Sequence, residues 1–158
     1  MTQHDPIHDD SARYATLLHR ASALWRTRLD NRLRPYGMTQ ATWRILWLLS
    51  QDGAPCNQSE LAARLGVENP TLVRTLDRME QKGWLRRVAD SRDRRRKHVE
   101  ITAAGLEAAR RMEGDVVAVR TEMLAGIPPD ELVGGIRLLE RIVAQGRAGE
   151  SQGAEEER

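Results

Sequence analysis

The fold is decided between Asn57 and Thr102, where the sequence is NQSELAARLGVENPTLVRTLDRMEQKGWLRRVADSRDRRRKHVEIT. A short helix is predicted first, because Asn57 can cap a helix and Gly66 can end it. A second helix begins near Pro70, where the missing N–H of proline costs nothing, and ends at Gly83. The stretch therefore predicts two helices joined by a tight turn.

The second of these helices has two chemically different faces. One face is apolar at helical spacing and should be buried; it consists of Leu72, Val73, Leu76 and Met79. The other face carries hydroxyl and guanidinium groups, which contact phosphates and base edges in DNA complexes; it consists of Thr71, Arg74, Thr75 and Arg78. A polar stripe is usually a solvated surface, but the preceding helix and turn and the basic loop that follows favour DNA.

Two short strands are predicted after the second helix, over residues 84–88 and 98–102, because apolar and polar residues alternate there. The segment from Arg86 to His98 contains, by count, seven Lys or Arg residues and two Asp residues. A loop with this charge density will not be buried. It is either a solubilising hairpin or a wing that lies along DNA and places an arginine in the narrow minor groove.

In combination, these motifs resemble the winged helix–turn–helix of the MarR family, and its SlyA-like branch in particular. The matching segments are TQATWRILWLL, NQSELAARLGVENPTLVRTLDRMEQKGWLRR and DRRRKHVEIT. The resemblance extends over about residues 12–147. It implies a mainly α fold with a small β-hairpin wing, in which a DNA-binding lobe is attached to a helical dimerisation region.

The resemblance implies a role for each polar residue of the second helix. The helix over about residues 70–82 should enter the major groove of double-stranded DNA. Arg74 matches the arginine of the family's LVRTLD motif and is the expected base contact. Thr71, Thr75 and Arg78 are expected on bases or phosphates.

In the wing, the sequence matches the family's DRR motif at Asp93, Arg94 and Arg95. Arg94 is expected to reach the minor groove, and Arg95 to pair with Asp93 or a phosphate and so orient the wing. The basic residues beside the motif are expected to neutralise phosphates; they are Arg92, Arg96 and Lys97.

The length of 158 residues fits one domain with a substantial core. The predicted division is a flexible N-terminus at 1–10, a single domain at 11–147 and a disordered acidic tail at 148–158. Inside the domain, the winged helix–turn–helix covers about 39–102, and dimerisation helices cover about 11–34 and 103–146. The net charge is only +2, but the basic residues gather in the wing. Such a local concentration favours a polyanion as partner.

The flanking helices carry broad apolar stripes of their own. Asp10 or Ser11 can cap the first helix, and Thr39 can cap the next, whose expected core face includes Trp43 and Trp47. The last helix should begin at proline 129 and end near residue 145. In the family that this chain resembles, the terminal helices interlock into a homodimer. The residues alone also allow a monomer, but a dimer is favoured because one module makes few phosphate contacts.

The sequence favours neither an enzyme nor a membrane protein. The four histidines are scattered, and no HExxH, CxxC or GxSxG motif occurs, so no catalytic residue, metal or cofactor is expected. His4 and His8 have only a loose metal-like spacing near the N-terminus. The single Cys56 excludes an internal disulfide and is interpreted as structural. No apolar run could span a membrane and no signal-peptide pattern occurs, so a cytoplasmic protein is expected.

An effector site is suggested by the resemblance. SlyA-like proteins bind small aromatic carboxylates between the dimer helices and the DNA-binding lobe. Arg26 and Trp43 stand at matching positions, in LWR and TQATW, and Trp25 lies beside Arg26. A tryptophan face and a guanidinium would suit an aromatic anion. The alternative is a set of core aromatic residues beside a surface arginine, and it is favoured for Trp47.

Together, these features predict a homodimeric, sequence-specific DNA-binding transcriptional regulator that recognises an inverted-repeat operator and is released by a small aromatic anion. The alternative is a small-molecule sensor or a protein-interaction module that does not bind DNA. Affinity for random duplex as a function of salt distinguishes the two, because a DNA binder loses affinity steeply as salt rises.

Overall fold

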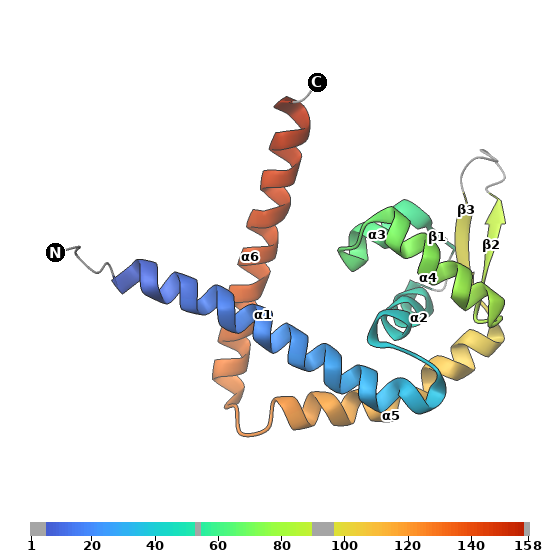
Figure 1. Ribbon diagram of the computed structural model, residues 1–158, viewed down its shortest axis with the longest axis horizontal. Coiled ribbons are helices and arrows are strands. Elements are labelled where there is room, and N and C mark those ends of the chain that lie inside the picture. Colours follow the sequence, from blue (N-terminus) through green and yellow to red (C-terminus); the bar gives the residue numbers. More distant parts are fainter. Residues whose placement is uncertain (1–5, 53–54, 90–96, 157–158) are drawn as a thin grey trace. The chain divides into compact units, whose positions relative to one another are not determined.

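The computed structural model describes residues 6–52, 55–89 and 97–156 (Figure 1). The chain forms two compact units, residues 1–121 and residues 122–158. The elements are α1 (Pro6–Leu33), the 3-10 helix η1 (Arg34–Tyr36), α2 (Gln40–Asp52), β1 (Cys56–Asn57), α3 (Gln58–Leu65), α4 (Asn69–Gln81), β2 (Leu85–Ala89), β3 (Lys97–Ile101), α5 (Ala103–Met123) and α6 (Pro129–Glu156). The prediction of a mainly helical fold with a small β wing is confirmed.

The helix–turn–helix forms where the local sequence predicts it. The side-chain oxygen of Asn57 accepts a hydrogen bond from the backbone N–H of Ser59 at 2.9 Å and so caps α3. Gly66 ends α3 with φ +66°, and Gly83 follows α4 with φ +71°. Both glycines adopt the left-handed conformation that residues with a side chain rarely accept.

The wing is part of a three-stranded antiparallel sheet with the order β1-β3-β2. The predicted hairpin is confirmed, with Arg86 opposite Glu100 and Arg87 opposite Val99. The third strand, β1, was not predicted. It contains only Cys56 and Asn57, with Cys56 opposite Val99, and two residues are too few to show an alternating pattern.

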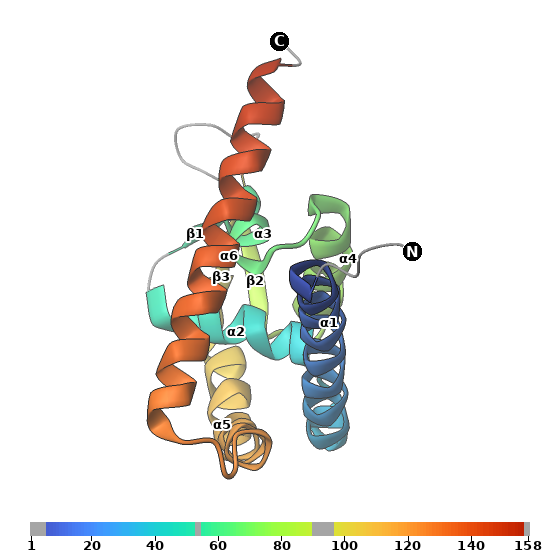
Figure 2. The same cartoon turned by 90° about the vertical axis from the view of Figure 1, so that its left-hand side faces the viewer.

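The core lies where α2, α3 and α4 pack with the sheet, and we call these elements the lobe. Figure 1 shows α1 extending to the left beyond these elements, and Figure 2 shows them turned by 90° about the vertical axis. The predicted apolar face of α4 is buried at Leu72, Leu76 and Met79, whereas Val73 is only half-buried. The remaining large, fully buried side chains of the lobe and of α1 include Leu33, Ile45, Leu46, Leu49, Leu61 and Leu85.

Two helix ends differ from the sequence-based expectation. α1 begins at Pro6 rather than at a cap on Asp10 or Ser11, because proline suits the first turn and the acids that follow it favour a helix N-terminus. α6 continues to Glu156, well beyond its predicted end near residue 145. The helix therefore extends into the segment 148–158 that the sequence leads us to expect as an acidic tail, where alanine, glutamine and glutamate favour helix.

Thr102 joins the wing to α5. Its hydroxyl accepts a hydrogen bond from the N–H of Gly105 at 3.1 Å, which caps α5, and donates one to the carbonyl of Gly83 at 2.6 Å. Gly105 is buried against the backbone of Trp84, where a Cβ atom would collide with the Trp84 carbonyl. The end of α4, the base of the wing and the start of α5 are thus in direct contact.

Several large apolar side chains remain exposed on the two terminal helices. On α1 they are Tyr14, Leu17 and Leu24; on α6 they are Val133, Ile136, Leu138, Leu139 and Val143. Apart from Leu138, these side chains follow the helical spacing that marks a packing face. In the described part of the chain, no helix has the length and apolar character needed to cross a membrane.

Candidate nucleic-acid interface

The outer face of α4 carries one hydroxyl and two guanidiniums. Thr71, Arg74 and Arg78 are exposed, and their spacing of three and four residues places them on one stripe. Arg74 makes one long hydrogen bond within its own helix, from Nε to the carbonyl of Pro70 at 3.4 Å. Its guanidinium therefore remains accessible on the surface of α4.

Thr75 differs from the other three residues that the sequence places on this stripe. It is only 8% exposed, and its hydroxyl donates a hydrogen bond to the carbonyl of Thr71 at 3.1 Å. The expectation that Thr75 lies on the exposed stripe is therefore wrong. It directly precedes the fully buried Leu76, so it lies at the edge of the core face of α4.

Most of the basic wing loop lies outside the described residues, and this applies to Arg92, Asp93, Arg94, Arg95 and Arg96. Lys97 is described; it is exposed and begins β3, opposite Ala89. It is therefore at the base of the loop.

Two further arginines of the wing are paired with acids. Arg86 forms an ion pair with Glu100 at 2.7 Å across the two strands, and its side chain is 69% exposed. Arg87 points the other way, with a side chain only 14% exposed, and forms an ion pair with Asp77 at 2.6 Å. Arg87 lies outside the motifs from which the site residues were predicted. Strand alternation could have identified it, because Arg87 lies two residues after the buried Leu85 and so on the same face.

The corner between α1 and α2 is held by polar contacts to three helices. Asp30 accepts a hydrogen bond from the N–H of Gln40 at 2.7 Å, at the start of α2. Lys82, beyond the end of α4, donates one to the carbonyl of Gly37 at 2.6 Å. Tyr36 donates its hydroxyl proton to Asp115 of α5 at 2.7 Å. This hydrogen bond and the charge of Asp115 raise the pKa of Tyr36 above its ordinary value of 10.0.

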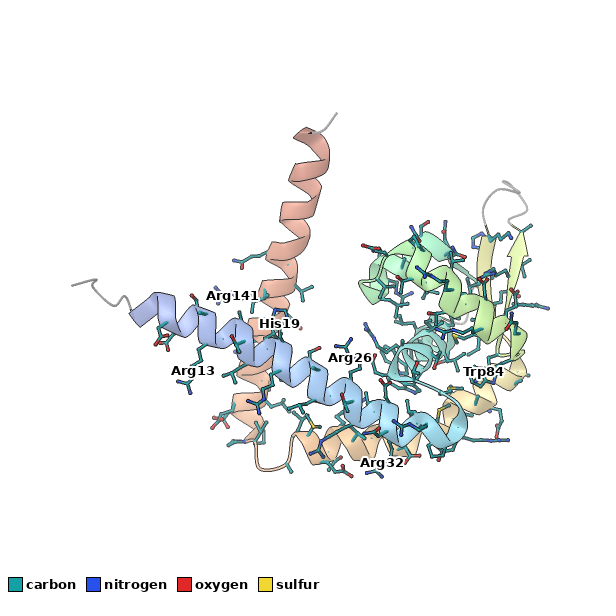
Figure 3. All side chains as sticks on the ribbon, viewed as in Figure 1. Arg13, His19, Arg26, Arg32, Trp84 and Arg141 are labelled. Atoms are coloured by element: carbon teal, nitrogen blue, oxygen red, sulfur yellow. The ribbon has the colours of Figure 1, made fainter. Side chains whose placement is uncertain are left out.

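A cavity of about 250 Å³ lies between α1, α2 and α5. It brings together Trp25 and Trp43, as the predicted effector site requires, but Arg26 does not line it. Arg26 projects from the opposite side of α1 to Arg32 in the view of Figure 3. The expectation that Arg26 supplies the cation is wrong for this cavity. Its lining residues are Trp25, Leu29, Gln40, Trp43, Arg44, Trp47, Val116 and Arg120, so Arg44 and Arg120 are the cations present.

Trp47 belongs to this cavity rather than to the core. It is 46% exposed, which corrects the expectation of a buried aromatic residue. Its ring stacks on Trp43, with the centroids 6.1 Å apart and the planes at 27°. The pair also forms a wall of a neighbouring cavity of about 360 Å³ between α2 and α5, to which Arg110 and Glu113 contribute.

A metal site has no support in the structured regions. Within residues 6–52, 55–89 and 97–156, no group of three or more His, Cys, Asp or Glu residues could hold a metal ion. Cys56 is buried in β1, and its thiol donates a hydrogen bond to the carbonyl of Asn57 at 3.5 Å.

Comparison with known proteins identifies relatives that share this architecture. The model of the MarR family matches residues 38–97. A transcriptional regulator named PA3341 is 38% identical, with 85% of this chain and 98% of that chain covered and a TM-score of 0.76. AbsC, a MarR family transcriptional regulator from Streptomyces coelicolor, is 24% identical, with coverage of 94% and 99% and a TM-score of 0.81. A cysteine-to-serine mutant of MarR from E. coli, complexed with operator DNA, is 23% identical, with coverage of 87% and 99% and a TM-score of 0.75. At identities below 25%, the likeness concerns the fold.

Proposed function

Because this chain belongs to the MarR family of DNA-binding transcriptional regulators, we propose that it recognises an inverted-repeat operator as a homodimer and responds to a small aromatic anion. The family consists of regulators rather than enzymes. The observation that carries the DNA-binding proposal is the exposed stripe of Thr71, Arg74 and Arg78 on α4. The MarR mutant from E. coli, which shares this fold, was solved in complex with operator DNA.

The homodimer is supported by the terminal helices. An exposed aliphatic side chain is normal when single, but the exposed residues of α1 and α6 form stripes along each helix. A twofold dimer would cover such stripes and would place two copies of α4 on successive turns of DNA, about 10 bp apart. We assign the chain to the SlyA-like branch because it combines LVRTLD, KGW and DRR.

α4 is the recognition helix in this proposal, and Arg74 reads bases. A guanidinium can donate two hydrogen bonds to a guanine edge, which contributes roughly 1–3 kcal/mol of discrimination. Arg78 and Thr71 lie one turn away on either side and would contact bases or phosphates. In the wing, Arg94 would enter the minor groove, where a narrow groove attracts cations regardless of the bases. Arg95 would pair with Asp93 or a phosphate and so orient the wing, and Arg92, Arg96 and Lys97 would neutralise phosphates.

One experiment separates base reading from phosphate binding. Arg74→Ala should lower operator affinity and also flatten the preference among single-base operator mutants. Arg94→Ala should weaken binding to many sequences and reduce the slope of log affinity against log salt by about 1. Both variants are titrated against the operator, its single-base mutants and random duplex at several salt concentrations.

The same titrations distinguish the proposed function from the alternative function. Unchanged sequence preference in Arg74→Ala would mean that α4 has been assigned wrongly, and unchanged salt dependence in Arg94→Ala would reduce the wing to a solvated hairpin. A small-molecule sensor or interaction module without DNA binding would show no salt-dependent affinity for any duplex, even with the wild-type chain.

The effector proposal rests on the 250 Å³ cavity. The rings of Trp25, Trp43 and Trp47 offer flat apolar surface, and Arg44 or Arg120 can pair with a carboxylate. A ligand bound here would weaken DNA binding only by favouring a conformation whose recognition helices are wrongly spaced.

The matching experiment is titration with salicylate, followed by tryptophan fluorescence and by operator affinity. Arg120→Gln and Arg44→Gln should weaken the response, and Arg26→Gln should leave it unchanged, because Arg26 lies outside the cavity. If millimolar salicylate changes neither fluorescence nor operator affinity, or if only Arg26→Gln matters, the site is not this cavity.

A further inference from the structure

Arg87 makes three hydrogen bonds from the wing to one stripe of the recognition helix. Its NH1 donates to Asp77 Oδ1 at 2.6 Å and to Glu80 Oε2 at 3.4 Å, and its NH2 donates to the carbonyl of Val73 at 3.1 Å. The three partners are four and three residues apart, so they lie on one face of α4. The side chain of Arg87 is only 14% exposed, whereas those of Asp77 and Glu80 are 48% and 39% exposed. The guanidinium end of these charge-assisted bonds is therefore shielded from solvent, unlike that of a fully exposed surface pair.

The backbone of the same residue is held from the other direction. The N–H of Arg87 donates to Glu80 Oε1 at 2.8 Å. β2 is an edge strand, because the strand order β1-β3-β2 gives it a neighbouring strand, β3, on one side only. On its other side, the backbone N–H and C=O groups of an edge strand have no strand to pair with. Glu80 therefore uses both carboxylate oxygens on Arg87, and the recognition helix serves as the neighbour of β2 on its open side.

The contact also changes the charge of the recognition helix. Asp77 and Glu80 are half-exposed, at 48% and 39%, and they stand on the helix that carries Arg74 and Arg78. Two carboxylates near a phosphate backbone oppose binding. The guanidinium of Arg87 compensates this charge without itself facing solvent.

The neighbouring Arg86 is a natural contrast. Its side chain is 69% exposed and forms a hydrogen-bonded ion pair with Glu100. This ion pair connects β2 to β3 and does not involve α4. Two adjacent arginines thus have different mechanical roles. Arg86 acts inside the wing, whereas Arg87 joins the wing to the recognition helix.

We propose that Arg87 is a positioning residue that makes the recognition helix and the wing one rigid DNA-binding unit. This inference rests on the proposed function, in which α4 occupies the major groove and the wing the adjacent minor groove. With the angle between them fixed in the free protein, the ordering of the wing is not added to the cost of binding. Arg87 contacts no DNA in this proposal.

The decisive test neutralises the two acids. If Arg87 were an ordinary DNA contact, the double variant Asp77→Asn, Glu80→Gln would release it and remove negative charge, and operator affinity would rise. If Arg87 positions the wing, the same variant should bind the operator roughly tenfold more weakly, since hydrogen bonds to a charged group are lost. Its affinity for random duplex should remain equal or rise with the added positive charge. Tighter operator binding would overturn the proposal.

Footprinting shows which groove is affected. At saturating protein, Arg87→Gln should lose protection of the minor groove against hydroxyl radicals while it keeps protection of guanine N7 in the major groove. Arg86→Gln is the matched control and should keep both. Circular dichroism of each variant checks that the folded fractions are equal. Arg87→Lys is a milder variant, because it keeps the positive charge but not the forked donors of the guanidinium. Proportional loss in both grooves would indicate a general structural defect and would overturn the proposal.

Hydrogen exchange in the free protein separates this inference from the proposed function. The amide of Arg87 should exchange about tenfold faster in the double acid variant and in Arg87→Gln, but not in Arg86→Gln. Unchanged exchange would show that the contacts do not hold β2, and the inference fails while DNA binding stands. If the wild type binds no duplex at any salt concentration, the proposed function has failed, and the positioning role fails with it.

Discussion

α4 and α6 carry the same kind of apolar pattern, but its side chains are buried on α4 and exposed on α6. Leu72, Leu76 and Met79 of α4 are at most 1% exposed, whereas Ile136 and Leu139 of α6 are 47% and 43% exposed. Periodicity predicts that a helix has an apolar face, but not whether the partner surface comes from the same chain. The comparison therefore contrasts a lobe whose apolar face is buried with terminal helices that carry exposed apolar side chains.

α1 shows both behaviours in one helix. Near its C-terminal end, Leu29 and Leu33 are buried. Earlier in the same helix, Tyr14, Leu17 and Leu24 remain exposed. The change occurs within two helical turns, so α1 joins the lobe at one end and offers an open apolar face at the other.

The largest expected effect breaks the open half of this comparison. Leu139→Glu should dissociate the dimer, because burial of one leucine contributes about 1.5–3 kcal/mol and a twofold interface contains it twice, roughly 3–6 kcal/mol in total. Sedimentation or light scattering at micromolar concentration measures the change. The control is Glu140→Gln on the same helix, which should keep the assembly of the wild type. If the wild-type protein is a monomer and still binds its operator tightly, the exposed apolar face of α6 is not a dimer interface.

A smaller effect tests how tightly the lobe is packed. Gly105→Ala places a Cβ against the carbonyl of Trp84 and within 2.9 Å of Ile101 Cγ1, so it should lower the free energy of unfolding by about 1–3 kcal/mol. Gly114→Ala, on the same helix with nothing within 4 Å of the added Cβ, should raise stability by about 0.5–1 kcal/mol. Chemical denaturation of both variants measures the difference. Equal effects would show that the α5–wing contact is loose.

The smallest effect concerns the corner where α1 meets the lobe. Because the hydrogen bond to Asp115 raises the pKa of Tyr36, the folded state holds the phenol proton more tightly than the unfolded chain does. This contribution to stability is fully present below the ordinary tyrosine pKa of 10.0 and is lost as pH rises through the raised pKa. Phenolate absorbance during alkaline titration measures the pKa of Tyr36.

Two variants serve as controls for this titration. Asp115→Asn should return the pKa of Tyr36 towards its ordinary value. Tyr36→Phe should remove the part of the absorbance change that occurs at the raised pKa. If Asp115→Asn leaves the titration unchanged, the corner is not held by this contact.

The sequence predicts the helix–turn–helix because its determinants are local. Asn57, Gly66 and Gly83 act on residues within a few positions of themselves, so their capping roles follow from spacing alone. The environments of Thr75, Trp47 and Arg87 depend on packing between elements. Thr75 is only 8% exposed although it lies in a polar stretch of α4, Trp47 lines a cavity formed by α1, α2 and α5, and Arg87 of β2 contacts Asp77 of α4. Strand alternation marks the side of the strand on which Arg87 lies, but no local pattern names its partner on α4, because tertiary packing decides such contacts.

The hydroxyl of Thr102 has a consequence for how the wing can change over evolution. This hydroxyl links Gly83 to the first turn of α5. The residues directly before and after segment 84–101 are therefore held together by a hydrogen bond. The loop of this segment can lengthen at a cost of only about 0.6 kcal/mol for each doubling. Neither flanking helix then has to move. Descendants of this gene can therefore vary the reach and charge of the wing while they inherit the helix junction intact.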